Sequence, residues 1–508
     1  AVQTRIGSSY SFHYRQMLPP MLDVLEFRSN NARHQPLIGA LKVVEAYLED
    51  KGRYFYPMEA TVLIEGVIPG VLQTWIYEQN RSGKLQVRRT RYELCVLQQL
   101  RDRLRRKAIW VVGADRHRNP DHDTPADFAE KRVAYYRALN LPLDADDFVN
   151  RLKQEMTAAL TLLHDGLANN PHVSITDSGR IRVQKLERQT ESANLVYLHN
   201  HVKQQWEMIS LLDVLKEADL RTHFTQHFHS LTGQSRLPLD VLRQRLLLGL
   251  YGLGTNTGVS RVCAGNPEVS ESQLKYIRRR FISTEGLRAA IAHLVDATLA
   301  VKDPAIWGEA ATWSASDSKQ FGAWDQNLRA QWHRRYRGAG VMVYWHVSKQ
   351  SLCIYSQLKA PSSSEAASMI EGVLRHCTAM QVDRSYVDTH GQSEVAFAFC
   401  HLLGFQLMPR LKNIYEQRLH LPHKEDTAKY PELEPMLKSA IDWDLIRHEY
   451  DEMVKYATAL RLGTAQTEAI LKRFTRSNIQ HPTYKAFSEL GRAIKTIFLC
   501  RYLHDIEV

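Results

Sequence analysis

The amino-acid sequence predicts a mixed α and α/β fold. Amphipathic helical periodicity dominates the first 300 residues. After residue 300, short runs rich in β-branched and aromatic residues alternate with helical segments, which predicts a mixed α/β unit with a small sheet. Because 508 residues exceed one ordinary core, we expect four parts: a helical basic region at 1–120, a helical scaffold at 121–300, the α/β unit at 301–424 and a helical segment at 425–508.

One of the N-terminal helices has two distinct faces. Leu97, Leu100 and Leu104 share one face, and the opposite face is basic, with Arg101, Arg103, Arg105, Arg106 and Lys107. A solvated surface is the commoner reading of such a face, and a contact with a polyanion is the alternative. Further helices are predicted at 126–140, 145–168, 193–218 and 238–252.

The α/β unit is predicted as strand, hairpin, helix, strand, helix and strand. A short strand at 310–316 ends at Asp317, and three residues that start at Ser348 join the two strands of the hairpin. A second short strand ends at Asp388, and the helix after it places Val395, Phe399 and Leu402 on one face. The remaining elements are hairpin strands at 340–347 and 351–358, a helix at 363–377 and a strand at 405–411.

Composition and charge narrow the class of protein. The chain is 44% hydrophobic and 24% charged, which is typical of a globular protein. No apolar run reaches the ~18 residues that cross a bilayer, so we expect no membrane partner. The net charge of +11 suits a polyanion such as DNA, although many basic proteins bind no nucleic acid. The six cysteines form no CxxC pair and read as reduced thiols of a cytosolic protein.

Two aspartates carry the chemistry that the sequence suggests. Asp317 and Asp388 each follow a predicted strand, 388 − 317 = 71 residues apart. Carboxylates on adjacent strands can hold a pair of divalent cations, and hard oxygen ligands suit Mg²⁺ or Mn²⁺. Two such ions activate an oxygen nucleophile and stabilise the leaving oxygen at phosphorus. The alternative is that each aspartate caps a turn or a helix.

The segments around these aspartates resemble the Tn-three family of replicative transposases, the TnpA type. The resemblance rests on SASDSKQF, on YWHVS in the hairpin, and on SYVDTHGQSEVAFAFCHLLGFQLMPRLKNI. It continues through LLLGLYGLGTNTGVSR at 246–261, the basic stretch 88–120 and SELGRAIKTIFLCRYL at 488–503. In that family the two aspartates of these motifs are catalytic, so the resemblance assigns these roles to Asp317 and Asp388.

The resemblance implies a fold, an activity and partners. It implies a ribonuclease-H-like catalytic domain at 301–424 that binds two Mg²⁺ or Mn²⁺ ions through Asp317 and Asp388, and a DNA-binding or dimerisation role for 1–120. The reaction would be cleavage of DNA at the 3′ ends of a transposon and strand transfer to a target, without a covalent enzyme–DNA intermediate. The partners would be double-stranded DNA and a second copy of the chain, in the bacterial cytoplasm.

The sequence departs from the family at several positions. Ser318 and Lys319 replace the usual Gly-Gln after the first aspartate, and Lys349 stands where the family often has Asp. The third carboxylate of the family lies in an LNKGE-like motif that we expect beyond Val508, in a longer protein that also extends before the first residue. The chain as given is therefore expected to cleave DNA inefficiently. We interpret Glu489 as a structural helix residue that pairs with Arg492 or Lys495.

Several other segments are candidate DNA contacts, with solvated or structural roles as rivals. His346 and His390 flank the aspartate motifs and could contact phosphate or metal-bound water. The glycine-rich segment at 252–258 reads as a helix-ending turn, and zinc binding by His223, His227 and His229 is improbable. The basic candidates for DNA are Arg101, Arg105, Arg106, Lys107, Lys275, Arg278, Arg279, Arg280, Arg334 and Arg335.

Two other function classes remain open at this point. One is a catalytically inactive, DNA-binding derivative of a transposase, which the absent third carboxylate favours and the two aspartates oppose. The other is a helical interaction protein with a basic surface, which requires the two aspartates to lie far apart in the fold.

Overall fold

The computed structural model describes residues 7, 10–11, 15–47, 50, 54–80, 82–105, 107–115, 117–184, 192–205, 209–233, 237–307, 312–324, 327, 330–333, 336–349, 351–474 and 482–505. The chain forms two compact units, each made of two stretches of sequence. The first unit is Ala1–Leu152 with Asp442–Gly491, and the second is Lys153–Ile441 with Arg492–Val508. The four-part division stays a prediction.

The first unit is mainly helical and has its own core. Buried Tyr92, Val96 and Leu100 of α5 pack with Leu37 and Leu41 of α3. This confirms the predicted apolar face of α5 for Leu100 and for Leu104, which packs against the cluster, whereas Leu97 is half-buried and lies outside it. The elements are α2 (Arg15–Val24), β1 (Phe27–Arg28), η2 (Ala32–His34), α3 (Gln35–Ala46), α4 (Gly70–Ile76), β2 (Tyr77–Gln79), β3 (Leu85–Val87), α5 (Arg89–Arg105), β4 (Trp110–Val111), η3 (Pro120–Asp123), α6 (Arg132–Ala138), α17 (Trp443–His448), α18 (Tyr450–Leu462) and α19 (Thr467–Arg473).

Two long helices run from one unit of the chain into the other. These are α7 (Ala145–Leu167) and α20 (Pro482–His504). The sequence predicts α7 almost to the residue at 145–168. The helix predicted at 126–140 is shorter, since α6 starts at Arg132.

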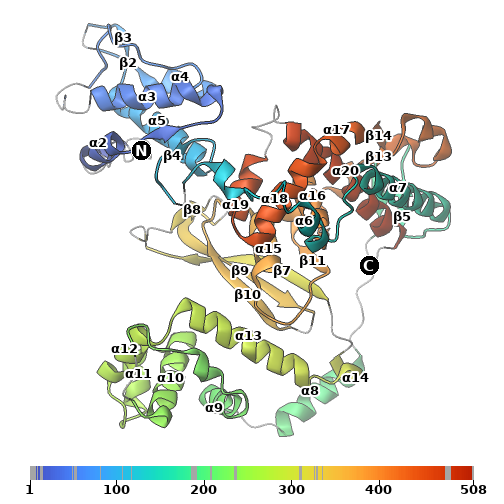
Figure 1. Cartoon of the computed structure of the whole chain (residues 1–508). Coiled ribbons are helices and arrows are strands. Elements are labelled where there is room, and N and C mark those ends of the chain that lie inside the picture. Colours follow the sequence, from blue (N-terminus) through green and yellow to red (C-terminus); the bar gives the residue numbers. More distant parts are fainter. Residues whose placement is uncertain are drawn as a thin grey trace. The chain divides into compact units, whose positions relative to one another are not determined.

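The second unit begins with a hairpin and a group of helices. Helices α10, α11 and α12 lie together (Figure 1) and bury Leu246, Ile277 and Phe281. The predicted helix at 193–218 is two helices, and residues 206–208 between them lie outside the described residues. The elements are β5 (Val173–Ile175), β6 (Ile181–Val183), α8 (Ala193–Gln205), α9 (Leu211–Thr222), η4 (Phe224–His227), α10 (Leu239–Gly254), α11 (Val259–Ala264), α12 (Glu271–Arg280), α13 (Thr284–Val301) and α14 (Pro304–Trp307).

A six-stranded mixed sheet forms the centre of the second unit (Figure 1). Its strand order is β10-β9-β7-β11-β12, with β8 paired to β9. The strands β7, β9 and β10 are antiparallel, and β11 is parallel to both β7 and β12. The elements follow the predicted order: β7 (Trp313–Gly322), β8 (Gln331–His333), β9 (Gly338–Ser348), β10 (Cys353–Lys359), α15 (Glu365–Arg375), β11 (Arg384–Val387), η5 (Thr389–Gly391), α16 (Glu394–Leu402) and β12 (Gln406–Pro409).

The two faces of the sheet differ in burial. Ser314 and Ser316 of β7 are buried, whereas Ala315, Asp317 and Lys319, which point to the opposite face, are exposed. The strands β9, β11 and β12 show the same alternation. We name the exposed face, which carries Asp317, the Asp face. Helix α15 packs on the other face and reaches the sheet at His346.

A glycine allows that close packing of α15. A Cβ atom on Gly372 would lie 1.8 Å from Nε2 of His346, so any other residue would push the helix off the sheet. Glycine costs helix stability relative to alanine, and here the close approach compensates for that cost.

The rest of the second unit packs around α16 and the end of α20. Val395, Phe399 and Leu402 of α16 are buried, which confirms their predicted shared face. The rings of Phe397 and Phe498 lie 5.5 Å apart. In the part of the chain described, no helix is long and apolar enough to span a membrane. The remaining elements are η6 (Ile414–Glu416), β13 (Leu419–Leu421), η7 (Lys424–Lys429), η8 (Glu434–Met436) and β14 (Leu437–Ala440).

Candidate active site

Asp317 lies within a strand, and this corrects the prediction that the strand ends before it. Strand β7 continues to Gly322 because its pairing with β9 runs unbroken from Ser314 to Gly322. The polar residues after Asp317 resemble a turn in the sequence, yet they alternate between the two faces of the sheet. Asp388 directly follows β11, as predicted.

The register of the sheet brings the two aspartates to the same level. In the parallel pair of β11 and β7, Val387 stands opposite Ser316. Asp388 and Asp317 are the next residues along the two strands. Neighbouring strands lie ~4.8 Å apart, and side chains at the same level point to the same face. The continued register therefore places both carboxylates on the Asp face.

The backbone around both aspartates is held by hydrogen bonds and close packing. The backbone N–H of Ser318 donates to Oδ1 of Asp317 at 2.6 Å. The N–H of Gly391 donates to the carbonyl of Asp388 at 3.3 Å. A Cβ atom at Gly391 would lie 2.3 Å from Cγ2 of Val387, so the turn after Asp388 requires glycine.

Tyr344 lies behind the aspartates in the buried layer and senses their charge. Its hydroxyl lies 3.1 Å from Oγ of Ser316. Burial raises the pKa of the Tyr344 phenol, and the negative charges of Glu365, Asp388 and Asp317 raise this pKa further. Both aspartates therefore lie close enough to Tyr344 to raise the pKa of its phenol.

Sequence reasoning missed a polar cluster next to Asp317. Oγ of Ser318 donates to Oε1 of Glu365 at 2.6 Å, and Nζ of Lys359 lies 3.7 Å from the same oxygen. Glu365 is the first residue of α15, after the N-cap Ser364. A helix start after serine was visible in the sequence, but the approach of this helix to β7 was not.

His346 has a structural position. It is fully buried, and its Nε2 lies 3.3 Å from the carbonyl of Ser368 in α15. Burial lowers the pKa of His346 to about 4, so the ring is neutral near pH 7. This excludes the suggested contact of His346 with DNA or metal-bound water. The side chain of His390 lies outside the described residues.

Glu489 makes a structural contact in the first unit. Its Oε2 accepts a hydrogen bond at 3.1 Å from the N–H of Asp442, the N-cap of α17. Arg492, one of its predicted partners, forms an ion pair with Glu394 at 3.5 Å in the second unit. Among the described residues, no group of three or more His, Cys, Asp or Glu side chains is placed to hold a metal ion.

The basic face of α5 is smaller than predicted. Arg101 is exposed and Arg105 is half-buried. Lys107 is a correction, because its side chain is buried and forms an ion pair with buried Asp123, which leaves its ammonium inaccessible to DNA phosphate. Arg106, Arg334 and Arg335 are candidates that lie outside the described residues.

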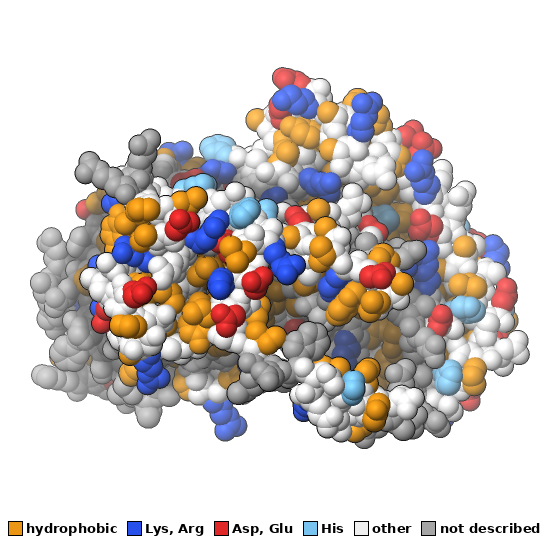
Figure 2. Space-filling view, turned by 90° about the horizontal axis from the view of Figure 1, so that it is seen from below, with side chains coloured by type: hydrophobic (Ala, Val, Ile, Leu, Met, Phe, Trp, Pro, Cys, Tyr) orange, Lys and Arg blue, Asp and Glu red, His pale blue; other side chains and the backbone are white. Residues whose placement is uncertain are grey.

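The basic cluster of α12 is divided between structural contacts and the surface. Lys275 pairs with Glu271 at 2.6 Å, and Nε of Arg280 donates to Oγ of Ser230 at 3.2 Å. Arg278 and Arg279 are exposed. On the face seen in Figure 2, Lys and Arg side chains stand among acidic and hydrophobic ones, so no continuous basic area appears there.

Two other sequence candidates are structural. Helix α10 ends at Gly254, and Asn256 and Gly258 have positive φ angles of 56° and 83° before α11 begins, which confirms the helix-ending turn. His227 packs against His293 with ring centroids 5.1 Å apart, and burial lowers the pKa of His227.

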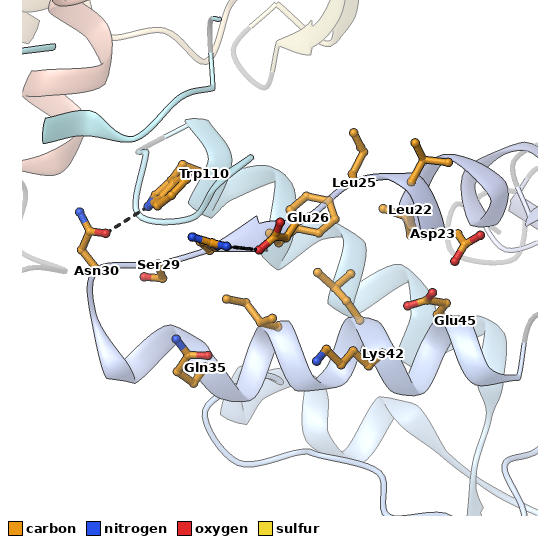
Figure 3. Close-up of a pocket in the computed structure, with 15 residues that line it drawn as sticks. Leu22, Asp23, Leu25, Glu26, Ser29, Asn30, Gln35, Lys42, Glu45 and Trp110 are labelled. Carbon is orange, nitrogen blue, oxygen red and sulfur yellow. Dashed lines mark hydrogen bonds and ion pairs between the residues drawn. The ribbon is translucent and has the colours of Figure 1, made fainter. Parts of the chain in front are cut away.

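A groove of about 720 Å³ lies in the first unit. Figure 3 shows Gln35, Lys42 and Glu45 on α3 facing the segment that carries Leu25, Glu26 and Ser29. The indole N–H of Trp110 donates to Oδ1 of Asn30 at 3.2 Å and closes one end. Its acidic and basic side chains are mixed, so the groove indicates no definite ligand.

Comparison with known proteins places the chain in a family. The Tn3 transposase DDE domain family matches residues 213–508. The chain is similar to the transposase of transposon Tn2501 from Escherichia coli, with 29% identity over 97% of this chain and 48% of that protein. It is also similar to the transposase of Tn1546 from Enterococcus faecium, with 25% identity over 97% of this chain and 49% of the relative.

A third relative is the transposase of transposon gamma-delta from Escherichia coli strain K12, which is 27% identical over 87% of this chain and 44% of its own length. The chain spans about half the length of the curated relatives it matches. The family match covers more than half of the 508 residues and includes the sheet with both aspartates. The chain therefore belongs to the Tn3 transposase family.

Proposed function

We propose that the chain is the central and catalytic part of a DNA transposase that cuts the 3′ ends of a transposon and joins them to target DNA. The observation that carries this proposal is the parallel register of β7 and β11, in which Val387 stands opposite Ser316, so that Asp317 and Asp388 are the next residues along two adjacent stretches of chain. A mixed sheet with two such carboxylates supports a ribonuclease-H-like catalytic domain. The family match supports the reaction.

The two aspartates fit a divalent metal ion. Carboxylate oxygens are the ligands that Mg²⁺ and Mn²⁺ prefer, and the exposure of Asp317 leaves room for a phosphate group. Bound ions would supply activation of the oxygen nucleophile and stabilisation of the leaving oxygen. Asp317, held by the N–H of Ser318, and Asp388, held by the turn at Gly391, would fix the position of these ions.

The test is binding of Mn²⁺ to the full chain, followed by electron paramagnetic resonance. Asp317→Asn and Asp388→Asn should each weaken binding at least tenfold, because each removes a negative ligand from a site with few others. Asp383→Asn is the matched control, since Asp383 is exposed and precedes the far end of β11. Equal Mn²⁺ binding by all four proteins would overturn the proposed metal site.

A second candidate is a catalytically inactive DNA-binding derivative. Among the described residues, no third His, Cys, Asp or Glu side chain joins the aspartates in a group placed to hold a metal ion, and this favours it. The two candidates differ in metal binding, since an inactive derivative needs none. Tight Mn²⁺ binding that depends on Asp317 and Asp388 would favour the transposase.

The partners of this function are part of the same proposal. Double-stranded DNA of the transposon ends and of the target would be the substrates, in the bacterial cytoplasm. We propose a homodimer, because two transposon ends must be joined in one reaction. Sedimentation of the full chain with and without duplex DNA tests this, and a monomer under both conditions would contradict it.

A further inference from the structure

One tryptophan on the sheet holds two cationic side chains. Nζ of Lys349 lies 4.6 Å from the ring centroid of Trp313, and Cζ of Arg384 lies 5.1 Å from the same centroid. The ring of Tyr386 lies 5.8 Å from the Trp313 ring and supports it from the next strand. Both cations are therefore held in place by cation–π attraction.

These side chains lie on the Asp face. Trp313 and Asp317 are four residues apart in β7, so their side chains point to the same side of the sheet. Arg384 stands opposite Trp313 in the parallel pair, and Tyr386 stands two residues before Asp388. Lys349 follows β9, and its N–H donates to the carbonyl of Trp313 at 3.1 Å. Four strand residues place the cations ~13 Å from Asp317.

The charges of this pair are not compensated by the described part of the protein. Neither Lys349 nor Arg384 forms an ion pair with a carboxylate of a described residue. Lys349 is exposed and Arg384 is half-buried. Two positive charges beside one ring repel each other, and an anion that contacts both would remove this repulsion.

We propose that Lys349 and Arg384, organised by Trp313, bind a phosphate of the DNA strand that enters the aspartate site. This site rests on the proposed function and adds a substrate contact to it. Arginine can donate two hydrogen bonds to phosphate, and lysine adds a compact charge. At ~13 Å from Asp317 the bound phosphate lies a few nucleotides from the phosphate that reacts, since a duplex strand rises ~3.4 Å per nucleotide.

The test is binding of the full chain to a fluorescent duplex of random sequence, in EDTA, over a series of salt concentrations. Lys349→Ala combined with Arg384→Ala should lower the slope of log affinity against log salt by about one, because the two side chains share one phosphate and each neutralised phosphate contributes about 0.9. Lys349→Arg combined with Arg384→Lys keeps both charges and should keep most of the slope.

Removal of the Trp313 ring tests whether the ring organises the two cations or whether their charges bind DNA without it. Trp313→Leu leaves the net charge unchanged, and it should weaken DNA binding about fivefold because the two cations are no longer held beside each other by the ring. Trp313→Phe should give an intermediate loss. The control is Lys302→Ala combined with Trp307→Leu, which removes another lysine–tryptophan contact, 4.1 Å long, from the end of α13.

The outcomes separate this site from the proposed function. A wild-type slope in the Lys349 and Arg384 double variant, with folding confirmed by circular dichroism, overturns the phosphate site. Mn²⁺ binding that still depends on Asp317 would leave the catalytic proposal standing in that case. Loss of slope without any aspartate-dependent Mn²⁺ binding would support the phosphate site and contradict catalysis. DNA binding that is insensitive to salt in the wild type would overturn both.

Discussion

Ser318 connects the strand that carries Asp317 to the first residue of α15, because its Oγ donates a 2.6 Å hydrogen bond to Oε1 of Glu365. Nζ of Lys359 lies 3.7 Å from the same oxygen and only 5% of the Lys359 side chain is exposed. The contact therefore joins the strand that carries Asp317 to the start of the helix on the other face of the sheet.

We predict that Ser318→Ala lowers the free energy of unfolding by about 1–2 kcal/mol, because it removes a hydrogen bond to a charged and largely buried carboxylate. Urea denaturation measures this effect. Ser362→Ala is the control, since its hydrogen bond to Gln331 is of equal length but exposed, and it should cost clearly less. Equal losses in the two variants would show that the Glu365 contact contributes no more to the free energy of unfolding than an exposed hydrogen bond does.

Glu489→Ala should reduce stability without changing metal binding. The carboxylate accepts from the N–H of Asp442 at the start of α17, so its removal leaves that helix end without this partner. We expect a loss of about 1 kcal/mol in the free energy of unfolding. Glu489→Gln retains an acceptor oxygen and should recover most of the loss. If Glu489→Ala instead abolished Mn²⁺ binding or nicking of plasmid DNA, Glu489 would be the third metal ligand.

Acid should destabilise the second unit through His346. Burial lowers the folded-state pKa of this ring to about 4, whereas the ordinary pKa of a histidine side chain is 6.5. Between these two pH values the unfolded chain binds a proton that the folded chain excludes. Stability is therefore fully present above pH ~6.5 and falls as the pH drops toward ~4, by on the order of 3 kcal/mol for this residue.

Denaturation midpoints measured from pH 7 to pH ~4 test this prediction. His346→Gln should flatten the pH dependence, even though the variant is less stable at pH 7. His122→Gln is the control because His122 is exposed. A pH dependence that is unchanged in His346→Gln would assign the effect to other groups, such as the half-buried His401, whose pKa is also lowered to about 4 by desolvation.

The basic residues should separate into structural and DNA-binding groups. Lys107→Met breaks a buried ion pair and leaves Asp123 with one cation fewer, so it should destabilise the protein by about 3 kcal/mol. Arg278→Ala combined with Arg279→Ala should leave stability unchanged and lower the salt slope of DNA binding, because both side chains are exposed. If only Lys107→Met lowered the affinity for DNA, Lys107 would belong to the DNA-binding group, and Arg278 and Arg279 would not.

The order of the α/β elements could be predicted from the sequence, because each carries a strong local signal. GVMVYWHV and the segment after it are rich in β-formers, and Val395, Phe399 and Leu402 have helical spacing. Asp317 and Asp388 could be proposed as a pair for the same reason, because each comes with a strand that has a strong local signal. The family resemblance supported this choice. The end of β7 could not be predicted from the sequence. The polar residues after Asp317 pair with residues of β9 that lie 20 or more positions away in the chain.

Burial explains the other differences between sequence and structure. Lys107 and His346 have polar side chains that sequence patterns place at functional surfaces, yet tertiary contacts with Asp123 and α15 bury them. Trp313 and the two cations beside it come from three strands or strand ends that are distant in sequence. No local pattern predicts such a meeting, because only the register of β7 with β11 and the end of β9 brings them together.

The contact between Gly372 and His346 limits how this family member can change over evolutionary time. Since a Cβ atom at position 372 would overlap the imidazole, neither position can vary alone toward a larger side chain. We expect the two positions to covary among descendants of this gene, with a side chain at 372 accepted only after position 346 has become small. The substitution at position 346 would then have to come first. Of the two possible orders of substitution, only this one would pass through a stable protein.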